Sequence, residues 1–360
     1  MSNLVDKAFA KLQKLNSNAT TLEKNTLSNV TEWIDTGCFV LNSILSGSLY
    51  GGVPKGRITI FAGDSGCGKT FILNKILAHA QQKGMIPVIF DTEVAVENEG
   101  AENVGLDTSN VKYVPVDTVE NCRNQIMAFL DEVEKEPELH GKFIISIDSL
   151  GNLASEKEIN DAGANKGAMD MGLRAKQLKS MMRIITYKAA VTGTTVIASN
   201  HTYADPGALH PTLVKQQAGG SGPVYMASIL VQMAAKKEKT DAGNTNDEAL
   251  TESRNYSGVT LRMLTVKNRF IPAFLQGEAY LNFKTGLEKY SGLKDIAVSH
   301  GIIQQNGSTY SMGEKKLGYY KNWRNDEVLW ADVLPKLESS ISEKYRYGQS
   351  LTDPTILEQE

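Results

Sequence analysis

Hydrophobic and polar residues alternate along this chain in blocks of two kinds. Short apolar runs, among them "RITIFAG", "IPVIFD" and "KFIISIDS", are separated by longer segments whose apolar residues recur every three or four positions. The runs predict buried strands, and the periodic segments, such as residues 69–83 and 119–136, predict helices. Nearly continuous apolar strands that alternate with helices are typical of a parallel sheet covered on both faces. We therefore expect an α/β core with a parallel central sheet.

The pattern changes after a long predicted helix, residues 169–191, and the strand "TTVIASN" that follows it. Three more apolar stretches then follow without helices between them: "ASILVQMA", "GVTLRMLTVKN" and "GEAYLNF". We expect them to extend the sheet as antiparallel strands. The polar segment 236–257 between the first two predicts an exposed hairpin turn.

The two ends of the chain differ from this core. Residues 1–15 place apolar side chains at helical spacing, and a Ser-, Thr- and Asn-rich linker follows. A helix this short needs a surface for its apolar stripe, either on its own core or on a neighbouring subunit. We divide the chain into an N-terminal oligomerisation helix and linker (1–30), a core (31–290) and a small C-terminal domain with a tail (291–360).

The composition is that of an ordinary globular protein. The 360 residues are 41% hydrophobic and 22% charged, with a formal net charge of −3. This excludes a protein coated in positive charge, so any bound nucleic acid requires cations concentrated in one groove. The three cysteines show no metal-ligand spacing, and no signal-peptide pattern or membrane-length apolar run is present. We expect a cytoplasmic protein without membrane contact.

The clearest motif is "GDSGCGKT" at residues 63–70, which matches G-x-x-x-x-G-K-[ST] between a predicted strand and a predicted helix. Its glycines let backbone amides converge on phosphates, and the helix N-terminus adds a favourable dipole. Lys69 is expected to reach the β- and γ-phosphates, and Thr70 to hold Mg²⁺. The expected nucleotide-binding residues are Gly63, Asp64, Ser65, Gly66, Cys67, Gly68, Lys69, Thr70 and Phe71.

Two carboxylates follow the predicted strands. Asp148 ends "FIISID", where the ligand crevice of a parallel sheet opens, so it suits a Mg²⁺-linked role; a helix N-cap is the alternative. Glu93 follows "IPVIFD" by two residues and is our candidate to polarise the attacking water. Asp91 and Glu97 remain rivals for that role.

Several stretches together resemble the RecA-type recombinases, in the order and spacing of that family over roughly residues 30–310. They are "DTGCFVLNSILSGSLYGGVPKGRITIFAG", "FDTE", "IDSLGNLAS", "DMGLRAK", "SNHTY", "AGGSGPVYMAS" and "TVKNRFIPAF". "IDSLGNLAS" followed by "SNHTY" is most similar to the strand-exchange recombinases of T4-type bacteriophages. The resemblance implies a RecA-like P-loop ATPase core that uses ATP and Mg²⁺, in the host bacterial cytoplasm if the protein is phage-encoded.

The resemblance also implies roles for residues near the nucleotide. Glu93 falls at the water-activating glutamate, and His201, beside Asn200, falls where the family senses the γ-phosphate with glutamine. Lys267 and Arg269 match two cations that reach the nucleotide of the adjacent subunit. The family's adenine-stacking aromatic falls near Gly100, so no base-stacking residue can be named.

Two Gly-rich stretches, about 155–170 and 202–222, correspond to the loops that hold single-stranded DNA in this family, and long loops inside a core are uncommon unless functional. Met171 matches an apolar wedge between base triplets, and Tyr225 an aromatic that couples the DNA loops to the ATP site across the subunit interface. The intercalating residue of the second loop stays open among Leu209, Leu213 and Val214. The expected DNA-binding residues are Met171, Gly172, Lys176, Arg183, Gly219 and Gly220.

These observations favour a single-stranded-DNA-dependent ATPase that forms a helical filament of identical subunits and pairs its strand with homologous duplex DNA. A single-strand-binding protein and a recombination mediator are the further partners that the resemblance implies. A hexameric helicase on the same core is the alternative enzyme, and a non-hydrolysing binding protein is the alternative from another class. An intact set of Lys69, Thr70, Asp148 and Glu93 argues against the last.

Overall fold

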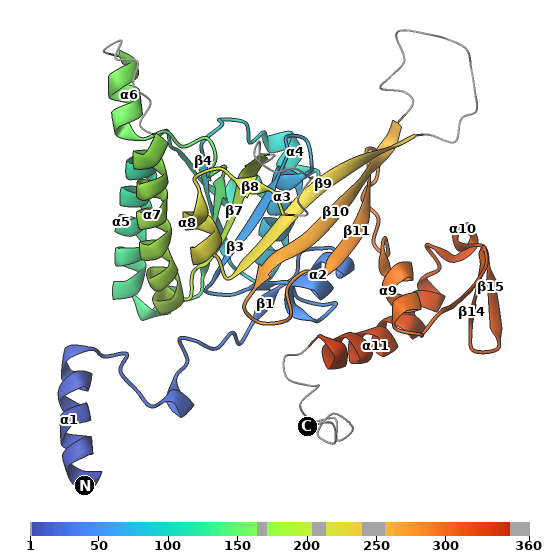
Figure 1. The fold of residues 1–360 in the computed structure, drawn as a ribbon, viewed down its shortest axis with the longest axis horizontal. Coiled ribbons are helices and arrows are strands. Elements are labelled where there is room, and N and C mark those ends of the chain that lie inside the picture. Colours follow the sequence, from blue (N-terminus) through green and yellow to red (C-terminus); the bar gives the residue numbers. More distant parts are fainter. Residues whose placement is uncertain (1, 164–170, 204–213, 240–255, 346–360) are drawn as a thin grey trace.

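The computed structural model describes residues 2–163, 171–203, 214–239 and 256–345. Its centre is a large twisted sheet with helices on both faces (Figure 1). The strand order is β12-β11-β10-β9-β3-β7-β6-β4-β5, with β8 paired to β7. The strands of the parallel part are β3 (Ile58–Gly63), β7 (Thr195–Tyr203), β6 (Phe143–Asp148), β4 (Ile86–Asp91) and β5 (Lys112–Pro115). The expected α/β fold with a parallel central sheet is confirmed.

The second half of the sheet corrects one expectation. β9 (Ile229–Lys239) pairs with β3 in parallel, and the antiparallel part begins only with β10 (Tyr256–Asn268), followed by β11 (Gln276–Asn282) and β12 (Gly286–Leu287). A parallel strand requires a crossover, and the chain between β7 and β9 supplies it, including the short helix α8 (Ser221–Met226). β9 and β10 also run further than expected into the polar segment 236–257, whose residues 240–255 lie outside the described part.

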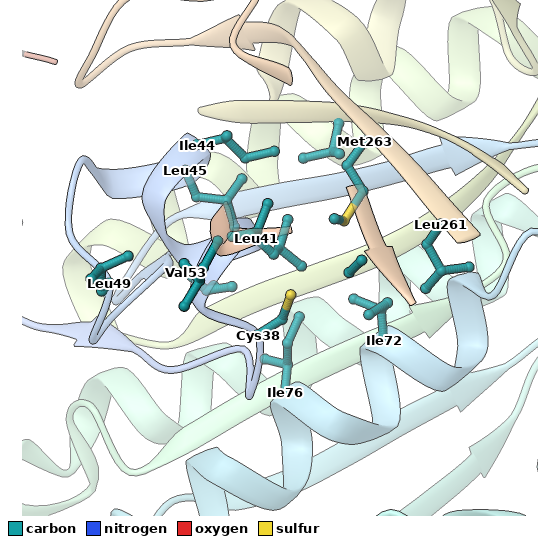
Figure 2. Close-up of a cluster of buried hydrophobic side chains, with 14 of the residues drawn as sticks. Cys38, Leu41, Ile44, Leu45, Leu49, Val53, Ile72, Ile76, Leu261 and Met263 are labelled. Atoms are coloured by element: carbon teal, nitrogen blue, oxygen red, sulfur yellow. The ribbon is translucent and has the colours of Figure 1, made fainter. Parts of the chain in front are cut away.

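Each face of the sheet buries its own apolar cluster. α5 (Val119–Lys135) and α7 (Met171–Thr192) pack side by side on one face (Figure 1) and cover strand residues such as Ile60 and Ile145. On the other face, α3 (Lys69–Gln82) and α2 (Phe39–Ser46) cover Phe61 and Ile89. Figure 2 shows how Leu41 and Ile44 of α2 meet Ile72 of α3 and Met263 of β10. These two layers fix the strands whose ends form the site.

The N-terminal segment stands apart from this body. α1 (Ser2–Leu15) lies away from the sheet in Figure 1, and Leu4 and Leu15 are 73% and 86% exposed. The linker contains the 3-10 turn η1 (Leu22–Lys24) and leads to a small hairpin of β1 (Trp33–Ile34) and β2 (Val53–Pro54). The apolar stripe of α1 is therefore not buried on its own core.

A small α/β unit follows β12. Its three strands are β13 (Gln304–Asn306), β14 (Thr309–Met312) and β15 (Lys315–Gly318), and its helices are α9 (Leu293–Ser299), α10 (Tyr320–Trp323) and α11 (Glu327–Lys344). Trp330 is fully buried against Tyr290 and Trp323. Glu338 on α11 accepts a 2.6 Å hydrogen bond from the amide of Leu49, which ties the unit to the core. The three strands of this unit were not expected from the sequence.

Residues 155–170 hold a second correction, because Glu156–Gly163 form the helix α6 rather than an irregular loop. Residues 164–170 lie outside the described part. The remaining short elements, none of them predicted, are α4 (Asn98–Glu102), β8 (Gln216–Gln217), η2 (Thr108–Asn110) and η3 (Pro137–Leu139).

Within the described residues, no helix combines the length and apolar character that a membrane span requires.

Candidate nucleotide-binding site

The carboxyl ends of four adjacent parallel strands bring the predicted site residues to one edge of the sheet. In the register of these strands, Gly63 of β3 pairs with His201 of β7, and Asp148 of β6 pairs with Asp91 of β4. A crevice outside the carboxyl ends of parallel strands is where open α/β sheets bind ligands. Glu93 follows β4 by two residues and so reaches the same edge.

The phosphate loop connects the buried strand β3 to the first turn of α3. Gly66 and Gly68 have φ of 73° and 81°, a backbone conformation that favours glycine. A Cβ at Gly63 would lie 2.4 Å from the carbonyl oxygen of Met233, so the neighbouring strand β9 requires glycine there. The Nζ atom of Lys69 donates to the carbonyls of Gly63 (3.0 Å) and Asp64 (2.8 Å). The loop therefore holds its lysine folded back on its own backbone.

Thr70 and Asp148 meet across the crevice. The Thr70 hydroxyl donates a 2.7 Å hydrogen bond to Oδ2 of Asp148, and the Ser199 hydroxyl donates to Oδ1. Burial raises the pKa of the Asp148 carboxyl, while these two hydroxyl donors act in the opposite direction. The N-cap alternative for Asp148 is wrong, because the next helix, α6, begins only at Glu156. Thr70 and Asp148 provide the hard oxygen atoms that Mg²⁺ prefers.

Glu93 is held by two partners at the neighbouring strand ends. Its Oε1 accepts a 3.0 Å hydrogen bond from Ser149 Oγ and lies 3.4 Å from His201 Nε2. Ser149 Oγ is also 3.4 Å from the same imidazole nitrogen. Its rival Asp91 is 1% exposed and accepts hydrogen bonds from the four backbone amides of residues 93–96 and from the Tyr113 hydroxyl. Asp91 therefore shapes the loop that carries Glu93 and has little capacity for another ligand.

A third set of groups lies at the end of α8. Lys267 Nζ donates to the carbonyls of Val224 (2.9 Å) and Tyr225 (2.7 Å), and Arg269 donates to the Tyr225 carbonyl at 3.2 Å. Burial, together with the neighbouring Arg269, lowers the pKa of Lys267 to about 8. The two cations bind the orphan carbonyls of a helix C-terminus, while the Tyr225 ring is 61% exposed.

The predicted DNA-binding residues lie on α7 and on the turn before α8. Lys176 and Arg183 are both exposed, while Leu178 between them is buried. Gly172 is exposed as well. Gly219 and Gly220 both have positive φ, and a Cβ at Gly219 would lie 2.5 Å from the Leu178 side chain. Met171 is the first residue of α7, whereas Leu209 and Leu213 fall outside the described residues.

Strand β7 and the turn before α8 are directly connected. The amide of Ala218 donates to the carbonyl of His201 at 2.9 Å, and the Asn200 side chain donates to the Ala218 carbonyl at 3.1 Å. β8 adds the register pairs of Thr202 with Gln217 and of Tyr203 with Gln216. Residues 219 and 220 therefore follow immediately on a segment that is paired with the strand end carrying His201.

Sequence reasoning missed three contributors to this edge. Ser149 and Ser199 bind the two key carboxylates, and no motif marks them. An open cleft of about 430 Å³ lies beside the phosphate-loop helix, lined by an aromatic residue of that helix, Phe71, and by Phe283, which is 61% exposed. Gly100 lines the same cleft. The aromatic residue that ends "GEAYLNF" was a usable signal, because an exposed phenylalanine beside a phosphate loop can stack on a base.

Comparison with known proteins gives a consistent result. The family model of the RecA N-terminal domain matches residues 3–288. Among curated proteins, the chain is 29% identical over 321 residues to Protein RecA of Mycolicibacterium vanbaalenii, covering 89% of this chain and 85% of that protein. It is 28% identical to Protein RecA of a Nitratiruptor species, over 91% of this chain and 87% of that protein. It is 29% identical to Protein RecA of Acidothermus cellulolyticus, over 90% of this chain and 87% of that protein.

Proposed function

This chain belongs to the RecA family, the recombinases of DNA recombination and repair, and on that premise we propose that it is an ATPase that forms filaments on single-stranded DNA and promotes homologous pairing and strand exchange. The observation that carries this proposal is the continuity between two sites. His201 contacts Glu93 at the nucleotide edge, and its carbonyl binds the amide of Ala218, immediately before the Gly219–Gly220 turn. A nucleotide-dependent movement of His201 would therefore be transmitted through Ala218 to the two glycines that we expect to bind DNA.

At the nucleotide, each side chain has a separate task. Lys69 is positioned at the loop to bind the β- and γ-phosphates of ATP, and Thr70 and Asp148 would hold Mg²⁺, which would neutralise charge that develops on the phosphate oxygens. Glu93 orients the attacking water and accepts its proton. Ser149 and His201 fix the Glu93 carboxylate, so they set where that water can bind.

Lys267 and Arg269 complete the site of a neighbouring protomer. Both side chains donate to carbonyls at the C-terminal end of α8, where the Tyr225 ring is exposed. Within the described residues, neither contacts the phosphate loop of its own chain. Burial and the neighbouring Arg269 lower the pKa of Lys267, so an anion beside it would stabilise its charged form. The phosphates of ATP bound by the adjacent subunit would provide that partner, so hydrolysis depends on assembly.

Phe283 provides the surface for the adenine base. Its exposed ring, Phe71 and Gly100 line one cleft next to the phosphate-loop helix. Stacking on one aromatic face is sufficient to hold a base in place. This supplies the base-binding residue that the sequence alone did not reveal.

Within the family we place the chain with UvsX, the strand-exchange recombinase of T4-type bacteriophages. The support is the stretch "IDSLGNLAS" followed by "SNHTY", in which histidine takes the position of the sensor glutamine. The partners are then single-stranded DNA, homologous duplex DNA, further copies of this chain, a single-strand-binding protein and a recombination mediator. The protein acts in the cytoplasm of the host bacterium.

Turnover of ATP by the purified chain, with and without single-stranded DNA, tests this function directly. We expect DNA to stimulate turnover and Lys69→Ala to abolish it. Electron micrographs with DNA and a slowly hydrolysed ATP analogue should show open helical filaments. Closed rings would favour the helicase, and turnover that is indifferent to DNA would refute the proposed coupling.

A further inference from the structure

Arg174, in the first turn of α7, binds the turn of the chain that follows β6. Its Nε atom donates a 2.6 Å hydrogen bond to the carbonyl of Leu153, and its Nη2 atom donates to the carbonyl of Gly151. The turn begins at Ser149, whose carbonyl accepts a 3.3 Å hydrogen bond from the amide of Asn152. One guanidinium group therefore connects the helix that we expect to bind DNA to the turn that carries Ser149.

Both partners of the Glu93 carboxylate depend on this turn. Ser149 lies within it and donates to Oε1 of Glu93 at 3.0 Å. His201 packs directly on it, because a Cβ at Gly151 would lie 2.6 Å from Cδ2 of the imidazole. The same Cβ would lie 3.4 Å from the Cβ of Ala218, which precedes the glycine turn. Gly151 thus fills the junction between the nucleotide edge and the segment that leads to α8.

The start of α7 also packs against the glycine turn before α8. A Cβ at Gly220 would lie 3.7 Å from the Cβ of Ala175, the residue after Arg174. Lys176, which we expect to bind DNA, is the next residue of the helix. Groups proposed to bind DNA therefore flank a side chain that holds the turn beside Glu93.

We propose that Arg174 is a positioning residue that couples DNA binding on α7 to the orientation of the Glu93 carboxylate. This inference rests on the proposed function. DNA phosphates bound by Lys176 and the Gly219–Gly220 amides would hold the start of α7 and the glycine turn together. From that helix, Arg174 holds residues 149–153 in place, and with them both partners of Glu93. Such orientation matters, because a misplacement of about 1 Å costs up to about 10²-fold in rate.

A direct contact of Arg174 with a DNA phosphate is the competing explanation. The two explanations differ for Arg174→Lys, because lysine keeps the charge that binds a phosphate but lacks the planar fork that reaches two carbonyls. They also differ in the salt dependence of DNA binding. A cation that neutralises a phosphate of single-stranded DNA adds about 0.7 to the slope of log affinity against log salt concentration.

The experiment measures ATP turnover of the full-length protein at saturating oligothymidylate, and binding of a fluorescent oligothymidylate over a salt series with a slowly hydrolysed ATP analogue. Arg174→Ala should lower kcat by about tenfold, within the range of mutations that change the coupling between two sites. KM for ATP should not change, because the phosphate loop is untouched. The salt slope should equal that of the wild type. Arg174→Lys should also keep this slope, and its kcat should stay close to that of Arg174→Ala.

Gly151→Ala is a second variant that reaches the same junction from the other side and leaves every cation in place. The backbone of Gly151 does not have a positive φ, so the close contact with His201 is the main obstacle to alanine there. Displacement of the imidazole should lower kcat at saturating oligothymidylate with an unchanged salt slope. Wild-type kcat in this variant would overturn the inference.

The matched control is Arg123→Ala. Arg123 of α5 is half-buried like Arg174 and also bonds to α7, but through the side chain of Gln177 at 3.2 Å. This variant should keep the kcat of the wild type.

Four outcomes would overturn the inference alone. For Arg174→Ala they are an unchanged kcat, a KM for ATP that rises as kcat falls, and a salt slope shallower by about 0.7. The fourth is full recovery of kcat in Arg174→Lys. If DNA does not stimulate turnover by the wild-type protein, the proposed function fails, and this inference fails with it.

Discussion

His201 Nε2 lies 3.4 Å from Oε1 of Glu93, although the two residues belong to strand ends that β6 separates in the sheet. Ser149, which follows β6, contacts both of them and bridges the gap. One carboxylate therefore contacts side chains at the ends of both β6 and β7, and β7 leads into residues 202–222. Five predictions test this arrangement and the elements around it.

Glu93→Gln should lower ATP turnover by about 10²- to 10⁴-fold, because the amide cannot accept a proton from water. Nucleotide-dependent binding of single-stranded DNA should persist, since the phosphate loop and Asp148 are unchanged. Turnover and oligothymidylate binding measured side by side check this. Glu97→Gln, at the start of α4, is the matched control and should retain turnover. A variant Glu93→Gln with wild-type turnover would remove Glu93 from the mechanism.

Ser199→Ala should shift the acid limb of turnover to higher pH. Burial raises the pKa of Asp148, and the Ser199 hydroxyl opposes that rise by donating to the carboxylate. Without this hydroxyl the pKa of Asp148 rises further, so the carboxylate becomes protonated at a higher pH than in the wild type. The protonated form would no longer bind Mg²⁺. A pH profile of kcat/KM at saturating Mg²⁺ measures the shift. An unchanged acid limb would mean that Asp148 does not control it.

Replacing both Lys267 and Arg269 with Ala should reduce DNA-stimulated turnover by about 10³-fold or more, the scale of cations supplied in trans. Lys267, with a pKa of about 8, is partly neutral just above neutral pH, and a phosphate of the neighbouring subunit's nucleotide would restore its charge. Mixing this double variant with the Lys69→Ala protein should recover part of the turnover, because one interface in the mixture joins an intact phosphate loop to intact cations. Absence of recovery at every mixing ratio would place the cations outside the neighbouring site.

Phe283→Ala should raise KM for ATP with little effect on kcat. Loss of one base-stacking contact costs about 1–3 kcal/mol, which corresponds to at least about a fivefold rise in KM. Steady-state kinetics test this, with Tyr319→Ala, which removes another exposed aromatic residue, one of the C-terminal unit, as the control. A second readout is discrimination between ATP and inorganic triphosphate, which the variant should lose. Unchanged KM and unchanged discrimination would exclude Phe283 from base binding.

Deletion of residues 1–20 should weaken filaments without unfolding the core. Leu4, Val5, Leu12 and Leu15 of α1 are exposed in the protomer, so their removal should change the free energy of unfolding by less than about 0.5 kcal/mol. Filament length in electron micrographs and thermal unfolding provide the two measurements. As point variants, Leu12→Ser should act like the deletion and Lys11→Gln should not. A large loss of stability in the deleted protein would show instead that α1 packs on its own core.

The sequence predicted those parts of the fold that local pattern controls. Apolar runs of six residues such as "IPVIFD" and the phosphate motif specify their own conformation, and the register of β3 with β7 then brings Gly63 and His201 together. The parallel pairing of β9 was not predictable from its own residues, because direction depends on the crossover formed by the chain before it.

Two missed elements did carry local signals. α6 begins with a capping box, in which the amide of Glu158 donates to Ser155 Oγ and the Ser155 amide to the Glu158 carboxylate. "QQNGSTYSM" contains the pair Gly307-Ser308, which β13 and β14 flank, and glycine at the first turn position favours a tight hairpin. By contrast, the contact of Asp64 with Lys215 joins residues far apart in the sequence, and only the folded chain reveals it.

The place of β3 in the middle of the sheet has a consequence for biosynthesis. Its two neighbours, β7 and β9, are translated long after it, and Met233 of β9 packs directly behind Gly63. A nascent chain that has left the ribosome only as far as α7 has the whole phosphate motif but neither flanking strand. Such late, non-local pairing is slow and leaves apolar strands uncovered in the meantime. The ability to bind ATP thus arises only after β9 has been synthesised, and chaperones have the greatest opportunity to act in the interval before that.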